Sequence, residues 1–330
     1  MTIYDIAKIA NVSASTVSRV INGKPGVKEE TRKKVAELLK QNHFSINEAA
    51  RGLVMQTSRL VGILLADIRN LHHMQGAYYI QSELEKRGYC GIILNTGTSV
   101  ENMKHAISVL EQRRVEGAVL MGSVFQEENI KKILTSSLTQ VPVIMINGQL
   151  DLPNCYCVMS DEKNGIAKCV RYLVSKGRRQ IVYLTDPLTP SNQLKVDGFW
   201  EGIKQAGPDV KGWLYRDDDG DRLKSSKRMM ELALKEHPQA DGVICAVDLL
   251  AAGALQFLHE RNIEVPEKIA LIGVDNSLYG QICYPQLTTL DNQIFSACVM
   301  GAHQLFDYLE GGNPPHCVSI QADLIFRGTA

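Results

Sequence analysis

The sequence lacks the features that would place a chain in a membrane or on an export pathway. No stretch approaches the ~18 consecutive apolar residues of a membrane-spanning helix. Its first residues are polar and charged, without the apolar segment of a secretory signal. We therefore expect a cytoplasmic protein with no membrane partner.

The sequence also lacks common signatures of nucleotide-binding and hydrolytic enzymes. No Gly-x-Gly-x-x-Gly follows a candidate strand, and neither Gly-x-x-x-x-Gly-Lys-[Ser/Thr] nor Gly-x-Ser-x-Gly occurs. These absences argue against an enzyme, one alternative for a chain in which strands and helices alternate. We expect no catalytic residues and no cofactor.

The eight cysteines include no Cys-x-x-Cys pair, and most of them lie in apolar runs. This pattern predicts reduced, mostly buried thiols. Cys155-x-Cys157 could in principle bind a metal ion. No His or Cys pair lies at a complementary spacing, so we expect no metal site.

The chain has no net charge, but its charges are unevenly distributed along the sequence. The formal net charge is zero, but residues 1–59 hold ten Lys and Arg against five Asp and Glu, which is +5. Residues 60–330 hold the other 26 against 31, which is −5. A basic first segment on an acidic remainder suits contact with phosphate groups at one end of the chain.

The first 22 residues predict two short helices separated by a tight turn. Thr2 can cap the first helix, with Asp5 placed as in a capping box, and Ser13 can cap the second. The polar side chains of the second helix share one face, at Ser15, Ser18, Arg19 and Asn22. Arg can chelate a guanine edge, Asn can pair with adenine, and Ser can serve either base. A solvated face on an ordinary helix pair is the other interpretation.

Residues 3–35, IYDIAKIANVSASTVSRVINGKPGVKEETRKKV, resemble the DNA-binding headpiece of the lactose-repressor (LacI) family of bacterial transcription regulators. The resemblance runs unbroken from Thr2 to Arg59. It implies that the second helix reads operator DNA, with Ala14, Ser15 and Arg19 at the base-contacting positions. The candidate DNA contacts are Thr2, Ala14, Ser15, Thr16, Ser18, Arg19, Asn22 and Leu53.

In that family, residues 47–54 (NEAARGLV) would form a hinge helix. The resemblance implies that two copies in a dimer insert Leu53 into the minor groove, where an apolar wedge bends the duplex. A packing role between linker and body is the alternative for Leu53. Eight residues that include Gly52 are too few for a stable isolated helix. We therefore expect the hinge to fold only on DNA.

From residue 60 the pattern changes to apolar strands alternating with amphipathic helices. The predicted strands are 60–65, 90–95, 117–121, 141–146, 181–185, 242–246 and 269–273. The predicted helices include 76–86, 100–113, 162–176, 191–205, 222–236 and 249–261. This alternation predicts an α/β body of two doubly wound lobes with parallel sheets.

The resemblance to the family's body, which is similar to periplasmic binding proteins, extends to the last residue. It predicts a helix-turn-helix headpiece at 1–46, a hinge and linker at 47–59, and a two-lobed effector-binding and dimerisation domain at 60–330. Lobe 1 would take about 60–159 and 292–320, and lobe 2 about 160–291 and 321–330. The chain would cross between lobes near 159–161, 291–292 and 319–321.

Open α/β lobes bind ligands at the carboxyl ends of their strands, so we expect an effector between the lobes. His72 and His73 follow the first predicted strand of the body and could bind hydroxyls or a carboxylate, or start a helix facing solvent. Lys195 matches the family's effector-holding arginine, without its bidentate fork, although a surface lysine is the alternative.

Three aspartates complete the candidate effector site. Asp275, in Gly-Val-Asp-Asn, matches the family's Gly-Phe-Asp-Asp and is suited to accept hydrogen bonds from sugar hydroxyls. Asp219 aligns with a position at which some members of that family place an aromatic side chain against the ligand. A solvated acidic turn is the alternative for Asp219. Asp248, in Ala-Val-Asp, matches the family's Asn-Asp after a strand, and a cap on the next helix is the alternative.

The sequence therefore predicts a ligand-responsive transcriptional repressor that binds a palindromic operator as a homodimer. Its effector would be a small polar molecule, namely a sugar, sugar acid or sugar phosphate. When bound to its operator it would be associated with the nucleoid. A solute-binding module without a role on DNA is the alternative, against which the basic headpiece argues.

Overall fold

The computed structural model describes residues 2–21, 23–42 and 57–330. They form two compact units, with the division between Ser58 and Arg59. The predicted hinge helix at 47–54, with Leu53, and the candidate DNA contact Asn22 lie outside the described residues.

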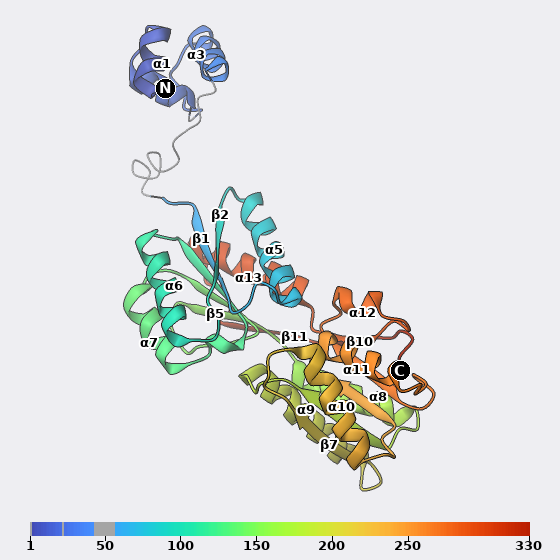
Figure 1. Cartoon of the computed structure of the whole chain (residues 1–330). Helices are drawn as coiled ribbons and strands as arrows, with labels where there is room; N and C mark the ends of the chain where they lie inside the picture. The colour runs from blue at the N-terminus through green and yellow to red at the C-terminus, as the bar shows by residue number, and fades with distance from the viewer. Residues whose placement is uncertain (1, 22, 43–56) are drawn as a thin grey trace. The chain divides into compact units, whose positions relative to one another are not determined.

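The first unit contains three helices, α1 (Ile3–Ala10), α2 (Ala14–Ile21) and α3 (Glu29–Gln41) (Figure 1). Thr2 and Asp5 form the predicted capping box, and Asn11 turns the chain in a left-handed conformation with φ 56°. Ser13 Oγ accepts the Thr16 N–H at 3.1 Å and so caps α2. The small core consists of Ile6, Ala7, Ala10, Val17 and Val35.

The first sheet of the second unit has the strand order β11-β5-β4-β3-β1-β2, and all its strands run parallel. Its strands are β1 (Leu60–Leu65), β2 (Cys90–Asn95), β3 (Gly117–Met121), β4 (Val143–Ile146), β5 (Cys155–Ser160) and β11 (Cys317–Ile320). Ile63 and Leu64 pack into different hydrophobic clusters on opposite faces of this sheet, so both faces are covered.

The helices of this lobe form the two outer layers (Figure 1). α5 (Leu71–Lys86) and α13 (Ile294–Leu309) pack on the face that contains Ile63. α6 (Val100–Gln112) and α7 (Glu128–Ser137) pack on the other face. A short 3₁₀ helix, η1 (Ser123–Phe125), follows β3.

The second sheet has the order β12-β10-β9-β8-β6-β7. Its strands are β6 (Gln180–Thr185), β7 (Lys211–Arg216), β8 (Gly242–Cys245), β9 (Ala270–Val274), β10 (Thr288–Asp291) and β12 (Asp323–Ile325). Only β12 runs antiparallel to its neighbour. The helices of this lobe are α8 (Glu162–Ser175), α9 (Pro190–Ala206), α10 (Arg222–Glu236), α11 (Asp248–Glu260) and α12 (Leu278–Ile282).

The chain passes between the lobes at three places, and hydrogen bonds tie these crossings together. After β5, the Asp161 N–H donates to the Ile320 carbonyl at 2.8 Å, at the end of β11. Ser160 Oγ donates to the Asn292 carbonyl at 2.7 Å, just after β10. The three crossings therefore form one hydrogen-bonded group. Any movement of one lobe relative to the other must involve this group.

The predicted fold class is confirmed, with differences of detail that have physical reasons. α5 begins at Leu71, five residues before the predicted start, because Asn70 caps it. The structure adds α13, which is apolar on several faces because it packs against both the first sheet and α5 beside it. It also adds short strands next to the crossings, whose few residues leave little alternation to detect.

The prediction that the cysteines are reduced thiols is wrong for two of them. The structure joins Cys157 and Cys317 in a disulfide, because β5 and β11 place them directly opposite each other. The other six thiols are free. Among the described residues no helix is both long and apolar enough to cross a membrane, and no cluster of His, Cys, Asp or Glu could hold a metal ion.

Candidate functional site

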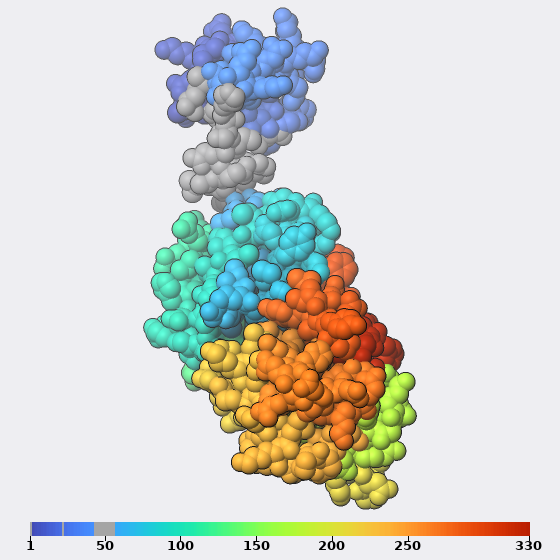
Figure 2. Space-filling model, turned by 45° about the vertical axis from the view of Figure 1, so that its right-hand side comes forward, coloured from blue at the N-terminus to red at the C-terminus, as the bar shows by residue number. Residues whose placement is uncertain are grey.

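A cavity of about 320 Å³ lies between the two lobes. Figure 2 shows the surfaces of the lobes meeting, with the light blue residues of the first against the yellow and orange residues of the second. Many lining residues lie one or two positions after strands: Asp67 after β1, Ser123 after β3, Asn147 after β4, Asp186 after β6, Asp275 after β9 and Asn292 after β10. The cavity is thus at the carboxyl ends of both sheets, where open α/β sheets bind ligands.

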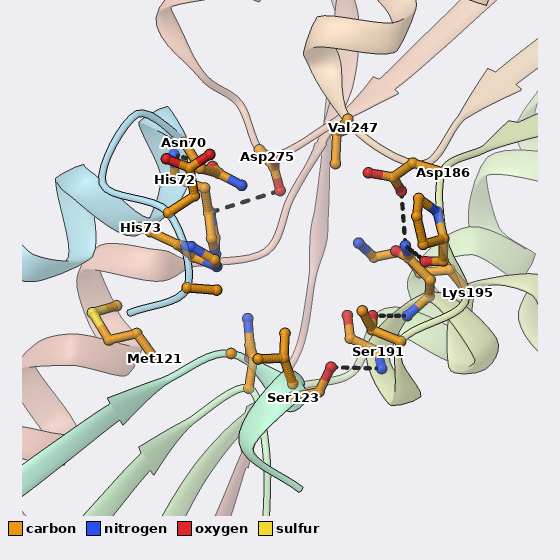
Figure 3. Close-up of a pocket in the computed structure, with 18 of the residues that line it drawn as sticks. Asn70, His72, His73, Met121, Ser123, Asp186, Ser191, Lys195, Val247 and Asp275 are labelled. Atoms are coloured by element: carbon orange, nitrogen blue, oxygen red, sulfur yellow. Dashed lines mark hydrogen bonds and ion pairs between the residues drawn. The ribbon is translucent and has the colours of Figure 1, made fainter. Parts of the chain in front are cut away.

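His72 and His73 enter this cavity from the first turn of α5 (Figure 3). The helix starts at this point because the Asn70 side chain accepts the His72 N–H at 3.0 Å. Burial lowers the pKa of His72 to about 4, aided by the positive charge of Lys195. Burial and the neighbouring His72 lower the pKa of His73 to about 4. Both rings are neutral at pH 7 and can donate and accept hydrogen bonds.

Asp275 faces His72 across the cavity, with 3.6 Å between its Oδ1 and the His72 Nδ1. Its backbone has φ 108°, which is strained for a residue with a side chain. The Asn292 side-chain amide donates to its Oδ1 at 2.9 Å. Burial raises the pKa of Asp275 to about 7, against the opposing influence of Lys195. Strain at a buried, cavity-lining carboxyl is typical of a functional position.

Lys195 is buried on α9 and lines the cavity. Its Nζ lies 3.3 Å from Glu162 Oε1 and also donates to the Ala246 carbonyl at 3.3 Å. The alternative interpretation of Lys195 as a surface lysine is therefore wrong. On the same helix, the Ser191 N–H donates to Ser123 Oγ at 3.0 Å and bridges the two lobes (Figure 3).

The charges that line the cavity are mostly compensated. Its carboxylates are Asp67, Glu162, Asp186, Asp217 and Asp275, and its cations are Lys195 and Arg222. Ion pairs join Lys195 to Glu162, Arg222 to Asp186, Arg69 to Asp67 and Arg228 to Asp217. Among the described residues, Asp275 is the one lining carboxylate whose only ion-pair partner is a neutral histidine.

Three buried polar atoms of the cavity have no hydrogen-bond partner among the described residues, namely His72 Nδ1, His73 Nδ1 and Asn292 Oδ1. Buried polar atoms without partners are rare, because each costs about 1–3 kcal/mol. His72 and Asn292 contact Asp275, and His73 lines the same cavity, so a ligand that presents several hydroxyl groups can satisfy these atoms.

The structure does not bring two of the predicted residues to the cavity. Asp219 is exposed and pairs with Arg228 at 2.8 Å. Asp248 is buried behind the site, where its carboxylate accepts hydrogen bonds from the Ser277 N–H at 2.7 Å and the Thr289 hydroxyl at 2.6 Å. Burial, with the negative charge of Asp275, raises the pKa of Asp248 to about 7. Asp248 thus positions the loop that follows Asp275.

Sequence reasoning missed several polar lining residues, among them Ser123, Asn147, Asp186, Ser191, Arg222 and Asn292. A positional rule would have found some of them, because Asn147 and Asp186 directly follow strands. Asn292 follows β10, a strand that the sequence pattern did not predict.

In the headpiece, Ser15 and Arg19 of α2 are exposed on the side away from the buried Val17. Arg19 donates to the Pro25 carbonyl at 3.2 Å, so its guanidinium lies over the loop that follows α2. Ala14, Thr16 and Ser18 are half-buried. Thr2 is exposed, and its hydroxyl donates to Asp5 at 2.9 Å in the capping box.

Comparisons with known proteins give one family match in each of the two units of the chain. Residues 2–56 match the family described as bacterial regulatory proteins, lacI family. Residues 170–330 match a periplasmic binding protein-like domain. The chain is 31% identical to an HTH-type transcriptional regulator of Lachnoclostridium phytofermentans, over 100% of this chain and 99% of the relative. It is 27% identical to catabolite control protein A of Priestia megaterium, over 94% of this chain and 92% of the relative.

Among solved structures, the chain is similar to the lac repressor dimer bound to operator and the anti-inducer ONPF. The TM-score is 0.89 at 23% identity, over 100% of this chain and 98% of that one. At this identity the likeness supports the fold. The fold and the sequence matches together define a DNA-binding transcriptional regulator and not an enzyme.

This chain belongs to the LacI family of bacterial regulatory proteins.

The raised pKa of Asp275 predicts a pH dependence of stability. In the folded protein this carboxyl keeps its proton up to about pH 7, but in the unfolded chain only up to about pH 4. The folded state therefore binds more protons between these values, so Asp275 makes the free energy of unfolding fall as the pH rises. The contribution is constant above about pH 7. Relative to wild type, the free energy of unfolding of Asp275→Asn should therefore rise by roughly 1–4 kcal/mol between pH 4 and pH 7.

Urea unfolding followed by tryptophan fluorescence measures this difference, because Trp200 and Trp213 both lie in the second unit. Asp219→Asn is the matched control, since Asp219 is exposed. Its stability should parallel that of wild type at every pH. Parallel curves for Asp275→Asn as well would contradict the assigned pKa.

Proposed function

We propose that this regulator is a repressor that binds a palindromic operator as a homodimer, and that a small polar effector in the cavity between the lobes controls its operator affinity. The main support is the set of three buried polar atoms of this cavity, on His72, His73 and Asn292, that have no hydrogen-bond partner in the part of the chain that the structure describes. We further propose that it acts in the cytoplasm and is associated with the nucleoid when bound to DNA.

For operator reading we propose Ala14, Ser15, Thr16, Ser18 and Arg19 on α2, with Thr2 nearby and with Asn22 and Leu53, which lie outside the described residues. Arg19 is the strongest candidate. It is exposed, and a guanidinium can make two hydrogen bonds to a guanine edge. An α2 of eight residues on a three-helix core has the dimensions of a major-groove recognition helix.

Arg19→Ala should weaken binding of the full-length protein about 10- to 100-fold on an operator selected from random DNA, because one bidentate base contact is lost. Lys40→Ala is the control, since it removes the same charge from the last turn of α3. It should change affinity only slightly and similarly for all sequences. Equal losses for both variants, measured by fluorescence anisotropy, would show that Arg19 contacts only phosphate.

For the effector we propose a ligand with several hydroxyl groups. Among the described residues Asp275 forms no ion pair with a Lys or Arg, so it can accept hydrogen bonds, and the neutral His72 and His73 offer further donors and acceptors. An anionic ligand would meet Asp275 while Lys195 and Arg222 are already paired. Of the three predicted classes, the charge balance therefore favours a neutral sugar over a sugar acid or a sugar phosphate.

A thermal-shift panel of neutral sugars, sugar acids and sugar phosphates tests this proposal. A neutral sugar should raise the melting temperature of wild type, since a ligand at 100-fold its Kd contributes about 2.7 kcal/mol. Asp275→Ala should abolish the shift, and Asp219→Ala, which alters an aspartate outside the cavity, should keep it. A larger shift with an anionic ligand, or no shift with any member, would contradict the neutral-sugar assignment.

The effector would act by population shift. His72 and Asp275, and Ser123 and Ser191, approach each other from different lobes, so a ligand bound among them stabilises lobe closure. Closure would favour one dimer arrangement over another and so change how the two headpieces meet their half-sites.

The proposed dimer rests on exposed apolar side chains of both lobes. Tyr78 on α5 is 67% exposed, Ile282 on α12 is 69% exposed, and Tyr284 is 89% exposed. Large apolar side chains with so much of their surface exposed are candidates for an interface. Ile282→Asp should therefore lower the mass found by sedimentation from that of a dimer towards that of a monomer. Leu232→Asp on α10, also at an exposed apolar residue, should leave the dimer intact. A dimer that survives Ile282→Asp at all concentrations would argue against this face.

A further inference from the structure

Cys157 and Cys317 are directly opposite each other in neighbouring parallel strands. The register pairs Cys317 of β11 with Cys157 of β5, and their Cα atoms are 4.6 Å apart. This separation is within the range that a disulfide spans without backbone movement. The bond links positions 160 residues apart in the sequence.

The other thiols are not arranged in this way. Cys169, Cys245 and Cys298 are buried in hydrophobic clusters, and burial raises the pKa of Cys169 and Cys298 to about 12. Burial also raises the pKa of Cys155 to about 11. A thiol with such a pKa is almost entirely protonated at neutral pH and reacts slowly. Their environments are those of inert structural cysteines.

The disulfide, in contrast, is accessible. β11 is the edge strand of the first sheet, and Cys317 is exposed on it. Cys157 and Cys317 both line an open pocket of about 780 Å³, together with Cys155 and His316. A small oxidant or thiol can therefore reach the sulfur of Cys317 from solvent, whereas Cys157 is buried behind it.

The two linked strands lead into crossings between the lobes. Three residues after Cys157, β5 ends at Ser160, and three residues after Cys317, β11 ends at Ile320. The Asp161 N–H to Ile320 carbonyl bond joins the strands at that point. The cysteine pair is thus on the same two strands as two of the crossings, outside the effector cavity.

We propose that Cys157 and Cys317 are a reversible oxidation site, at which a peroxide forms the disulfide and a small thiol reduces it. In the forward direction the Cys317 thiolate attacks the peroxide, giving a sulfenic acid and water or an alcohol. The Cys157 thiol then displaces hydroxide from that sulfur, which leaves as water, so one peroxide oxidises two thiols. In the reverse direction two small thiols supply two electrons and two protons and are released as their own disulfide.

The location of this regulator supports reversibility. A DNA-binding regulator works where small thiols keep cysteines reduced, and disulfides found there are usually transient or redox-sensing. The bond fixes the spacing of β5 and β11 just before two crossings. Its formation therefore restricts the relative movement of the lobes, with or without an effector in the cavity.

The test uses the full-length protein, reduced with a thiol and then treated with hydrogen peroxide. Intact mass and thiol alkylation should show the loss of two of the eight thiols, and peptide mapping should find Cys157 joined to Cys317. The oxidised protein should melt roughly 5–10 °C higher, because the link closes a long loop in the unfolded chain. Excess glutathione should restore all eight thiols and the lower melting temperature.

Cys317→Ser should abolish both the link and the difference in melting temperature. Cys90→Ser, which alters another exposed cysteine, should keep both. Should Cys317→Ser fold poorly, Cys157→Ser makes the same test from the buried side. A link that maps elsewhere, equal melting of the two forms, or a bond that survives excess glutathione would each overturn the proposal.

Hydrogen exchange separates this proposal from the effector function. Without any sugar present, oxidation should slow amide exchange at residues 158–161 and 318–322 in wild type and in Cys90→Ser. It should have no such effect in Cys317→Ser. Unchanged exchange in wild type would contradict the link to the crossings, whereas the sugar panel can fail without affecting this result.

Discussion

The hydrogen bonds among the three crossings are the constraint on which the body depends. Ser160 is bound to the carbonyl of Asn292, and Asp161 to that of Ile320. Asn292 also holds Asp275 in the cavity. The segments that let the lobes move are therefore one bond away from the residue best placed to detect a ligand. A ligand that changes the position of Asp275 must also act on the crossings, which is the physical requirement for coupling between a cavity and a distant surface.

Charge compensation explains why this cavity can be polar and still stable. Burying a carboxylate without a partner is costly, and four of the five lining carboxylates have a Lys or Arg beside them. The fifth, Asp275, is accommodated by a raised pKa, and its backbone is strained, with Asp248 holding the following loop. The site thus concentrates its unfavourable energy at one residue, where binding can recover it.

Much of the fold follows from local sequence signals. The capping box at Thr2, the cap at Ser13 and the apolar strands at 60–65 and 117–121 all appear in the structure as predicted. Local patterns could not reveal α13, whose burial arises from contacts with α5 and a sheet far away in sequence. They also placed Asp248 and Asp275 alike, although one faces the cavity and the other lies behind it. The cysteine pair was missed because local patterns do not show which strands pair, and these two cysteines are 160 residues apart.

The cavity is lined largely by residues one or two positions beyond the strands, such as Ser123, Asn147 and Asp186, while the strands themselves belong to the hydrophobic cores. Substitutions at these positions alter what the cavity accepts, while the apolar strand residues that form the cores stay the same. A duplicated gene could therefore acquire a new chemical signal through a handful of changes while retaining its scaffold. The same separation makes these loop positions the natural set to randomise when such a body is engineered as a biosensor.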